Sequence, residues 1–413
     1  MGAILGLTCV DCGREHRADE TLYTCVACGG NLDVRYDYGA IRAAWSRESL
    51  AADRDAGIWR WLPLLPLAAR PAIPLTIGGT QLVAAPRLAG ALGLGALHIK
   101  DDGRNPSASL KDRASAIAVA RALAGGITRV TAASTGNAAS SLATIAASVG
   151  LETVIFVPEA IPRAKLAQLL LHGARVVLIR GNYDAAYDLC LEATARFGWY
   201  SRNTGYNPYL AEGKKTVALE VAESLAWRAP DRVFISVGDG CILAGVHKGF
   251  ADLLALGWID RVPALVGVQA EGAASLATAF RAGARTAADV RAVTPQTFAD
   301  SIAVGKPRDA TKALRAARDT GGEIMTVADD EIRDAMRRLA RDAGVFAEPA
   351  GAAAFAGLAR LARDGRVRRG ERVVVLVTGS GLKDVESAIR LVEPPTPIDP
   401  DLDAVAAALG IGV

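Results

Sequence analysis

The feature that most constrains the fold is a repeated alternation between short apolar runs and longer segments rich in Ala and Leu. Six runs rich in Val, Ile and Leu lack polar alternation, which is typical of parallel strands buried on both faces. They span residues 129–133, 152–157, 175–179, 232–237, 264–269 and 372–377. Helical stretches such as residues 160–172 and 184–197 lie between them. This βαβ order predicts an α/β fold with a doubly wound parallel sheet, in which ligands bind at the carboxyl ends of the strands.

The composition is that of a folded chain of enzyme size. Its 413 residues are enough for two or three domains, and 51% of them are hydrophobic, which excludes disorder. The net charge of +3 and the lack of a basic block give no sign of a nucleic-acid partner. We find neither a signal peptide nor an apolar run long enough for a membrane span. We therefore expect a cytoplasmic protein with a small-molecule substrate and no membrane partner.

Lys111 is the first candidate for a reactive residue. It lies in the stretch N-P-S-A-S-L-K-D-R, residues 105–113, after a strand that ends at Lys100. We expect a helix to begin here with Ser109 as N-cap and with Asp112 in the first turn, where a carboxylate suits the helix dipole. A cation does not suit this position, and an ordinary lysine would simply be solvated. This lysine follows small residues and leads into a buried helix, and desolvation makes a lysine a usable nucleophile or Schiff-base former.

Three loops follow predicted strands and precede predicted helices. The first, S-T-G-N at residues 134–137, surrounds a helix N-terminus that suits a carboxylate or a phosphate. The second, V-G-D-G-C-I-L-A-G at residues 237–245, has glycines that let backbone N–H groups approach a phosphate. The third, T-G-S-G-L-K-D, occupies residues 378–384. Each loop alone is a common cap or turn, but their shared position at strand ends indicates one ligand site.

Four cysteines near the N-terminus form two C-x-x-C pairs that twelve residues separate. They are Cys9, Cys12, Cys25 and Cys28. Each pair is followed by a glycine, which allows the tight turn that aims two sulfurs at one centre. In a cytosolic protein this spacing predicts a structural Zn²⁺ site rather than disulfides, with reduced free thiols as the alternative. Four thiolates leave no coordination position for a substrate, so the predicted role is structural.

Together these motifs resemble the threonine synthase branch of the fold-type-II pyridoxal-phosphate enzymes. The cofactor lysine of that family lies in a Ser-Phe-Lys-Asp-Arg segment, where this chain has Leu110 in place of Phe. The segments at residues 77–82, 301–308 and 348–353 extend the resemblance, and many threonine synthases carry a similar N-terminal zinc ribbon. The matches run from Cys9 to Asp384. The resemblance implies two doubly wound α/β subdomains plus a small N-terminal zinc ribbon.

The resemblance also implies a role for each loop. Lys111 is expected to bind pyridoxal 5'-phosphate covalently and to act in catalysis. Ser134, Thr135 and Gly136 belong to the loop that holds the substrate α-carboxylate, and Asn137 faces the ring hydroxyl of the cofactor. The expected cofactor-phosphate loop comprises Gly238, Asp239, Gly240, Cys241 and Ile242. The Asp239 side chain must turn away from a phosphate, so mainly backbone amides are expected to bind it. The hydroxyl of Thr378 meets the pyridine nitrogen, and such a neutral partner favours elimination and replacement over transamination.

The expected domain boundaries follow from these motifs. Residues 1–36 form the zinc ribbon, residues 37–400 the catalytic domain and residues 401–413 a C-terminal tail. Within the catalytic domain, a small subdomain covers residues 105–215, approximately, and the larger subdomain contains the rest. We further expect a helix with tryptophan anchors over residues 36–67, and a homodimer.

One position departs from the family pattern. Threonine synthases recognise the phosphate of O-phosphohomoserine with an Arg in a segment that reads N-P-x-R-x-E-G-Q-K-T. Here Leu210 occupies the Arg position, and a leucine cannot supply the bidentate contact. Arg202, Lys214 and Lys215 are the candidates for a compensating charge.

The sequence therefore leaves three hypotheses. The preferred one is a lyase that converts O-phosphohomoserine and water to threonine and phosphate by γ-elimination and β-addition. The second keeps the cofactor and assigns β-elimination or β-replacement on a hydroxy- or phospho-amino acid, as in threonine or serine ammonia-lyases and cysteate synthase. The third is a cofactor-binding or zinc-ribbon interaction protein without catalysis, which the intact Lys111 disfavours.

Overall fold

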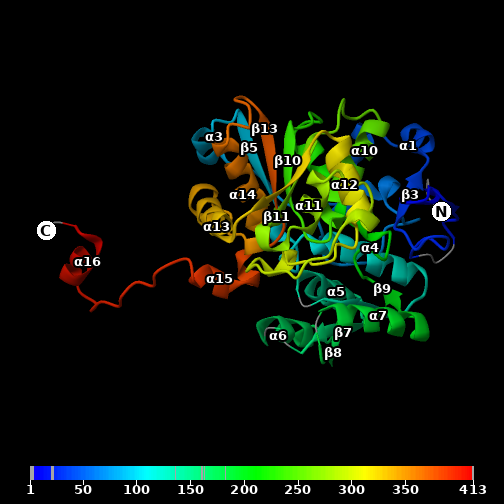
Figure 1. Ribbon diagram of the computed structural model, residues 1–413, viewed down its shortest axis with the longest axis horizontal. Helices are drawn as coiled ribbons and strands as arrows, with labels where there is room; N and C mark the ends of the chain where they lie inside the picture. Colours follow the sequence, from blue (N-terminus) through cyan, green and yellow to red (C-terminus); the bar gives the residue numbers. More distant parts are fainter. Residues whose placement is uncertain are drawn as a thin grey trace.

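The computed structural model describes residues 4–19, 23–134, 136–159, 161, 163–181 and 183–411. Three sheets organise this part of the chain, and helices cover both faces of the two larger sheets (Figure 1). All six predicted strands are present at their expected positions, within one residue at the carboxyl end. The structure therefore confirms the α/β fold with parallel, doubly wound sheets.

The largest sheet has six strands in the order β12-β11-β10-β13-β5-β4, parallel except for the antiparallel edge strand β4. The strands are β4 Leu82–Ala84, β5 Ala96–Asp101, β10 Arg232–Ser236, β11 Ala264–Ala270, β12 Glu323–Val327 and β13 Arg372–Val377. Alternate residues of β13 enter different cores: Val373 and Val375 pack on one side of the sheet, Val374 on the other. Because both faces of this strand pack against an apolar core, apolar and polar residues do not alternate along it, and the run is continuously apolar.

Two helix layers sandwich this sheet. The core that contains Val373 is closed by α3 (Pro86–Leu92), α13 (Asp329–Ala343) and α14 (Pro349–Arg363). The core on the opposite face is closed by α4 (Lys111–Ala124), α9 (Thr216–Ser224), α10 (Cys241–Ala255) and α12 (Ala310–Asp319).

The second sheet has four parallel strands in the order β8-β7-β6-β9. They are β6 Arg129–Ala133, β7 Glu152–Pro158, β8 Arg175–Ile179 and β9 Tyr200–Ser201. Its helices are α5 (Asn137–Ser148), α6 (Arg163–Leu171) and α7 (Tyr183–Phe197). Leu142 and Ile145 of α5 join the core that α4 and α10 share, whereas α7 closes a small separate core through Tyr187 and Cys190. Helix α5 thus connects the small sheet to the rest of the molecule.

The expected helix over residues 36–67 is wrong. This stretch instead holds α1 (Tyr38–Ala44), α2 (Arg47–Ala52) and a 3₁₀ helix, Ile58–Leu64, that contains Pro63. The side chains of Asp37 and Ser46 cap α1 and α2, so each helix has its own start. The tryptophans do act as anchors, because Trp45 and Trp61 are buried and pack edge to face at 6.1 Å.

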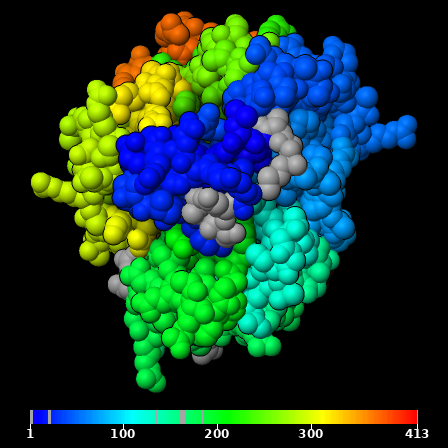
Figure 2. Space-filling model, turned by 90° about the vertical axis from the view of Figure 1, so that its right-hand side faces the viewer, coloured from blue at the N-terminus to red at the C-terminus, as the bar shows by residue number. Residues whose placement is uncertain are grey.

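A small antiparallel sheet of β1 (Ile4–Cys9), β2 (Glu15–His16) and β3 (Leu32–Tyr36) carries the four cysteines. Figure 2 shows this N-terminal module in dark blue, bordered by yellow and green segments from later in the chain. Asn31 donates a hydrogen bond to the carbonyl of Gly205 at 2.6 Å, and Lys312 of α12 donates to the carbonyl of Leu32 at 2.7 Å. The module is therefore docked on the catalytic domain.

The remaining helices are α8 (Leu210–Lys214), α11 (Ser275–Arg281), α15 (Val385–Ile389) and α16 (Leu402–Leu409). In Figure 1, α16 stands apart from the body at the end of an extended segment. Among the residues described here, no helix combines the length and apolar character that crossing a membrane requires.

Candidate active site

Lys111 begins α4, and the loop before it is paired with the loop after β13. The N–H of Leu110 donates to the carbonyl of Thr378 at 2.9 Å, and the N–H of Ser380 donates to the carbonyl of Ala108 at 3.0 Å. Ser109 forms an antiparallel bridge with Gly379. These bonds fix the start of α4 against the carboxyl end of the central strand β13.

The same pairing corrects one sequence prediction. Ser109 is not the N-cap of α4; Leu110 holds that position, with helical φ and ψ and no side-chain cap. An N-cap residue normally leaves the helical region of φ and ψ, and its oxygen accepts from the first turn. Ser109 instead lies in the bridge to Gly379, and its buried hydroxyl has no hydrogen-bond partner among the described residues.

A buried network of ion pairs links α4, the helix that begins at Lys111, to neighbouring elements. Arg113, fully buried, donates to Asp102 at 2.7 Å and to Glu220 of α9 at 2.6 Å, and Lys100 donates to Glu220 at 2.6 Å. Glu220 also accepts from the backbone N–H of Gly79 at 2.9 Å, which ties the segment at residues 77–82 to the site. Each charged side chain in this network is paired with a side chain of opposite charge. The ion pairs therefore fix the positions of α4, α9 and β5 relative to one another.

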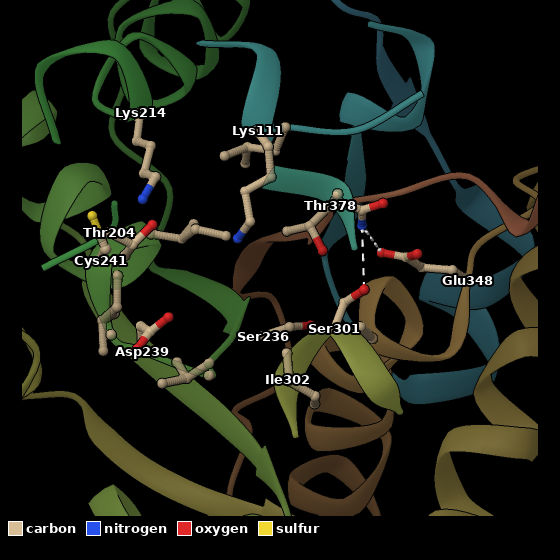
Figure 3. A pocket seen from close by; sticks show the side chains of 18 residues that line it. Lys111, Thr204, Lys214, Ser236, Asp239, Cys241, Ser301, Ile302, Glu348 and Thr378 are labelled. Carbon is tan, nitrogen blue, oxygen red and sulfur yellow. Dashed lines mark hydrogen bonds between the residues drawn. The ribbon is translucent and has the colours of Figure 1, made fainter. Parts of the chain in front are cut away.

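The environment of Lys111 depresses its basicity. Burial, together with the nearby cations Lys214 and Arg202, lowers the pKa of Lys111 to about 8. Figure 3 shows the Lys111 amine inside a cavity, with Lys214 on one side and Thr378 on the other. About one tenth of this amine is therefore neutral at pH 7, far more than for an ordinary lysine, and the neutral form is the one that acts as a nucleophile or a base.

The loop of residues 238–242 forms one wall of that inner cavity at the N-terminus of α10. Gly240 is left-handed, with φ of 91°, and a Cβ there would lie 2.7 Å from the Cβ of Ala313. Helix α10 has no side-chain cap, so its first N–H groups remain available to a ligand. The carboxylate of Asp239 accepts from the N–H of Arg308 at 3.2 Å. Cys241 and Ile242 also line the cavity.

Asn137 and Thr378 lie across the cavity from this loop. Asn137, the first residue of α5, donates to Glu348 at 2.7 Å and to Ser301 at 3.4 Å, as the dashed lines of Figure 3 mark. Thr378 also lines this cavity, and Figure 3 labels its side chain there. Burial raises the pKa of Glu348 to about 7, and the bond from Asn137 lowers it only partly.

A larger outer chamber, of about 500 Å³, adjoins the inner cavity and shares Lys111 and Asn137 with it. This volume lies within the range of small-molecule sites. Ser134 and Gly136 line the chamber, with the Ser134 hydroxyl accepting from the Gly136 N–H at 3.2 Å, whereas Thr135 lies outside the described residues. The structure thus brings the described members of all three predicted loops around Lys111.

The three candidates for a compensating charge differ sharply. Lys215 is neutralised by Glu212 at 2.5 Å and Asp252 at 2.6 Å, and it lines neither cavity. Lys214 lines the inner cavity and Arg202 the outer chamber. Glu348, Ser301 and Thr204 also line the cavities, and the sequence analysis gave them no role. Their only sequence signal was that two of them lie in segments of the family resemblance.

The four N-terminal cysteines meet the geometric needs of a metal site. Their sulfurs lie within 4.8 Å of one another, with Cys9–Cys28 at 3.5 Å and Cys12–Cys25 at 3.7 Å. Tetrahedral Zn–S bonds of about 2.3 Å would set the sulfurs about 3.8 Å apart. The cluster therefore fits a tetrahedral cation.

The cavity likewise fits pyridoxal phosphate. It offers an amine of low basicity, uncapped helix N–H groups with a buried ammonium beside them, and the hydroxyl-bearing side chain of Thr378 in its wall. These are the groups that an aldehyde, a phosphate and a ring nitrogen require.

Comparison with known proteins agrees with this geometry. Residues 73–379 match the family model described as "Pyridoxal-phosphate dependent enzyme". A threonine synthase of Methanosarcina acetivorans is 39% identical over 404 residues, which is 98% of both chains. A threonine synthase of Mycobacterium leprae is 38% identical over 82% of this chain and 91% of its own.

Solved structures show the same fold at lower identity. A diaminopropionate ammonia lyase from Escherichia coli superposes with a TM-score of 0.66 at 18% identity, over 84% of this chain and 92% of that one. A fungal L-serine ammonia-lyase from Rhizomucor miehei gives 0.64 at 23% identity, over 76% and 98%. At these identities the likeness concerns the fold, whereas the curated relatives match nearly end to end. The chain therefore belongs to the family of pyridoxal-phosphate dependent enzymes, on its threonine synthase branch.

Proposed function

We propose that this enzyme is a lyase of the threonine synthase type that converts O-phosphohomoserine and water to threonine and phosphate. The relatives named above support the reaction class. The observation that carries the choice of a phosphorylated substrate is the guanidinium of Arg202. Only 1% of this side chain is exposed, it lines the outer chamber, and one of its terminal nitrogens, Nη2, has no partner among the described residues.

Arg202 is held so that this nitrogen stays free. Its Nε donates to the hydroxyl of Ser115 at 2.9 Å, and its Nη1 donates to the hydroxyl of Thr204 at 3.2 Å. Both partners are neutral, and no described carboxylate forms an ion pair with this guanidinium, although Asp112 and Asp239 lie near enough to act on it. Burial lowers the pKa of Arg202 to about 10, which still leaves the group charged at neutral pH. A buried cation of this kind is suited to a dianionic phosphate.

The position of Leu210 also supports a phosphorylated substrate. Its side chain is fully buried in the apolar core and lines neither the inner cavity nor the outer chamber. It therefore does not form a wall that selects an unphosphorylated side chain. The phosphate-binding charge comes instead from Arg202, eight positions earlier in the chain.

The roles of the other residues follow from their positions. Bound pyridoxal phosphate supplies the electron sink that makes the α-hydrogen of an amino acid acidic. Ser134 and the N–H groups at the start of α5 bind the substrate carboxylate, and Asn137 and Thr378 orient the cofactor ring. Lys111 holds the cofactor and then acts as the base, taking protons from Cα and Cβ of the substrate. Phosphate leaves the γ-carbon, the hydroxyl of a water molecule adds at Cβ, and protons return to Cγ and Cα.

The cysteine cluster and the assembly belong to the same proposal. We propose that Cys9, Cys12, Cys25 and Cys28 bind one structural Zn²⁺, and that the enzyme works as a homodimer in the cytoplasm. The four-sulfur geometry supports the metal. Light scattering coupled to size-exclusion chromatography measures the assembly.

The experiment that tests the substrate compares phosphate release with ammonia release from four amino acids: phosphohomoserine, threonine, serine and phosphoserine. We expect phosphate and threonine from phosphohomoserine. Arg202→Gln should raise KM for phosphohomoserine roughly ten- to a hundredfold, because a charge-assisted bond contributes about 1.5–3 kcal/mol. Ammonia release from threonine or serine, without phosphate release from phosphohomoserine, would overturn the proposal and favour an ammonia-lyase.

A further inference from the structure

Lys214 presents an unpaired positive charge to the inner cavity. Its side chain is fully buried, and its Nζ has no hydrogen-bond partner among the described residues. Lys215, the next residue, is equally buried but donates to two carboxylates. A buried charge without a partner is strongly disfavoured, and proteins normally pair such groups or keep them for a ligand. Lys214 therefore needs an anion that the described residues do not supply.

Close helix packing fixes Lys214 beside the loop of residues 238–241. Gly245 of α10 lets α8 approach so closely that a Cβ at Gly245 would lie 2.8 Å from the Cβ of Lys214. On the other side of α8, a Cβ at Gly213 would lie 2.0 Å from the carbonyl of Arg113. The lysine thus has little freedom to move toward solvent. Figure 3 shows its amine directed into the cavity, near Cys241 and Thr204.

The charged groups around this amine do not neutralise it. Lys111 and Arg202 are both cations. Burial raises the pKa of Cys241 to about 11, against the opposing effect of Lys214, so the thiol remains neutral. Burial also raises the pKa of Asp239, and its carboxylate already accepts from the N–H of Arg308. Among the described residues no side chain forms an ion pair or hydrogen bond with the Lys214 ammonium, which lines the same cavity as the N-terminus of α10.

We propose that Lys214 binds the phosphate group of pyridoxal phosphate, and that Arg202 serves only the substrate. The two cations line different cavities, although both influence the Lys111 amine: Lys214 lines the inner cavity and Arg202 the outer chamber. Lys214 and the N-terminus of α10 form one anion site, in which an ammonium adds to backbone N–H groups. The inference rests on the proposed cofactor site and does not depend on the identity of the substrate.

The test compares two aldehydes that differ only in the phosphate. Apoenzyme is prepared with hydroxylamine and titrated with pyridoxal phosphate or with pyridoxal, and covalent binding is followed by absorbance after borohydride reduction. Lys214→Met keeps the length of the side chain and removes the charge. We expect it to weaken pyridoxal phosphate binding roughly ten- to a hundredfold, and to change pyridoxal binding less than about threefold.

Two further variants keep the test decisive. Lys214→Arg restores a cation and should recover most of the affinity for pyridoxal phosphate. Arg202→Gln should leave that affinity unchanged, although it removes a buried cation at a similar depth. If Lys214→Met does not fold, the ³¹P resonance of the cofactor in wild-type and Lys214→Arg enzyme decides the matter. It should show a phosphate that stays dianionic between pH 6 and 8, because a neighbouring cation lowers its pKa.

Three results would overturn the inference. They are an unchanged affinity of Lys214→Met for pyridoxal phosphate, an equal loss of affinity for pyridoxal, and a bound phosphate that titrates like the free cofactor. A loss confined to the KM for phosphohomoserine would instead assign Lys214 to the substrate. The comparison of the two aldehydes does not involve the amino-acid substrate. A wrong substrate assignment can therefore be distinguished from a wrong role for Lys214.

Discussion

The amide of Asn137 donates to the carboxyl group of Glu348 at 2.7 Å, across the junction between the two large sheets. Asn137 begins α5 of the four-stranded sheet, and Glu348 directly precedes α14, which packs on the six-stranded sheet. The donor of this bond is a neutral amide, and no described cation forms an ion pair with Glu348. The protonation state of Glu348 is therefore linked to the hydrogen bond that joins the two sheets at the cavity.

The first prediction concerns this carboxyl group. Burial raises its pKa to about 7 from an ordinary value of 4.5, so the folded protein binds a proton here that the unfolded chain releases. Stability of the apoenzyme should accordingly fall as pH rises from 4.5 through 7. Glu348→Gln removes this loss, which amounts to about 3 kcal/mol in the free energy of unfolding at pH 8. Denaturant unfolding of both proteins at pH 5 and pH 8 measures it, and parallel pH profiles would contradict it.

The second prediction concerns Lys111. Lys111→Ala should abolish borohydride-trapped cofactor, and peptide mapping of the wild-type enzyme should find the label on Lys111. Because its pKa is about 8, the rate of covalent uptake by the apoenzyme should rise with pH and level off above that value. Lys306, which lines the outer chamber, provides a matched control, and Lys306→Ala should retain the label. A label on another lysine would refute the assignment.

The third prediction concerns the cysteines. Protein purified without chelator should contain one zinc per chain, and Cys12→Ser should lose it. Removal of the metal by a chelator should destabilise the N-terminal module first. In such a small sheet the free energy of metal binding supplies much of the free energy of folding. Hydrogen exchange at β1–β3 then increases before exchange at β10 or β13. Cys190→Ser is the control, since Cys190 lies in the small core at α7. Elemental analysis that finds no zinc would remove this idea.

The fourth prediction concerns Leu210. Because this side chain is fully buried in the apolar core, Leu210→Arg should destabilise the fold by at least about 3 kcal/mol through an unpaired buried charge. It should not create a better phosphate site. Leu210→Met, which conserves volume, should cost less than about 1.5 kcal/mol and keep KM for phosphohomoserine. A stable Leu210→Arg variant with a lower KM would show that the side chain reaches the chamber.

Five of the six predicted strands were predictable from sequence because they are buried on both faces, whereas the edge strand β8 is apolar but largely exposed. Buried strands leave continuous apolar runs, and the helices between them follow from composition. Strands β9 and β12 were missed for the opposite reason: β9 has two residues, and β12 reads Glu-Ile-Met-Thr-Val, which mixes polar and apolar positions. The prediction of Ser109 as the N-cap was wrong because its backbone forms a β-bridge with Gly379, in a loop that is distant in sequence.

The charges of the site were less predictable. Lys214 and Lys215 are adjacent and chemically identical in the sequence, yet one faces the cavity and the other faces two carboxylates. One step along a helix turns a side chain by about 100°, so only the orientation of α8 separates their environments. Arg202 likewise gives no local signal. The loops could be assigned from their place after strands, whereas the cations depend on packing between distant helices.

The docking of the N-terminal module sets an order of events during synthesis. Thr311 of α12 donates to Asp11 at 2.7 Å, and Arg315 donates to the carbonyl of Val10 at 2.9 Å, across 300 and 305 positions of chain. Asp11 and Val10 thus cannot make these contacts until α12 has emerged from the ribosome. Contacts so far apart in sequence form late, because the chain between them must be ordered first. The module can gather its cysteines early, but the contacts that attach it to α12 can form only after some 300 further residues have been synthesised.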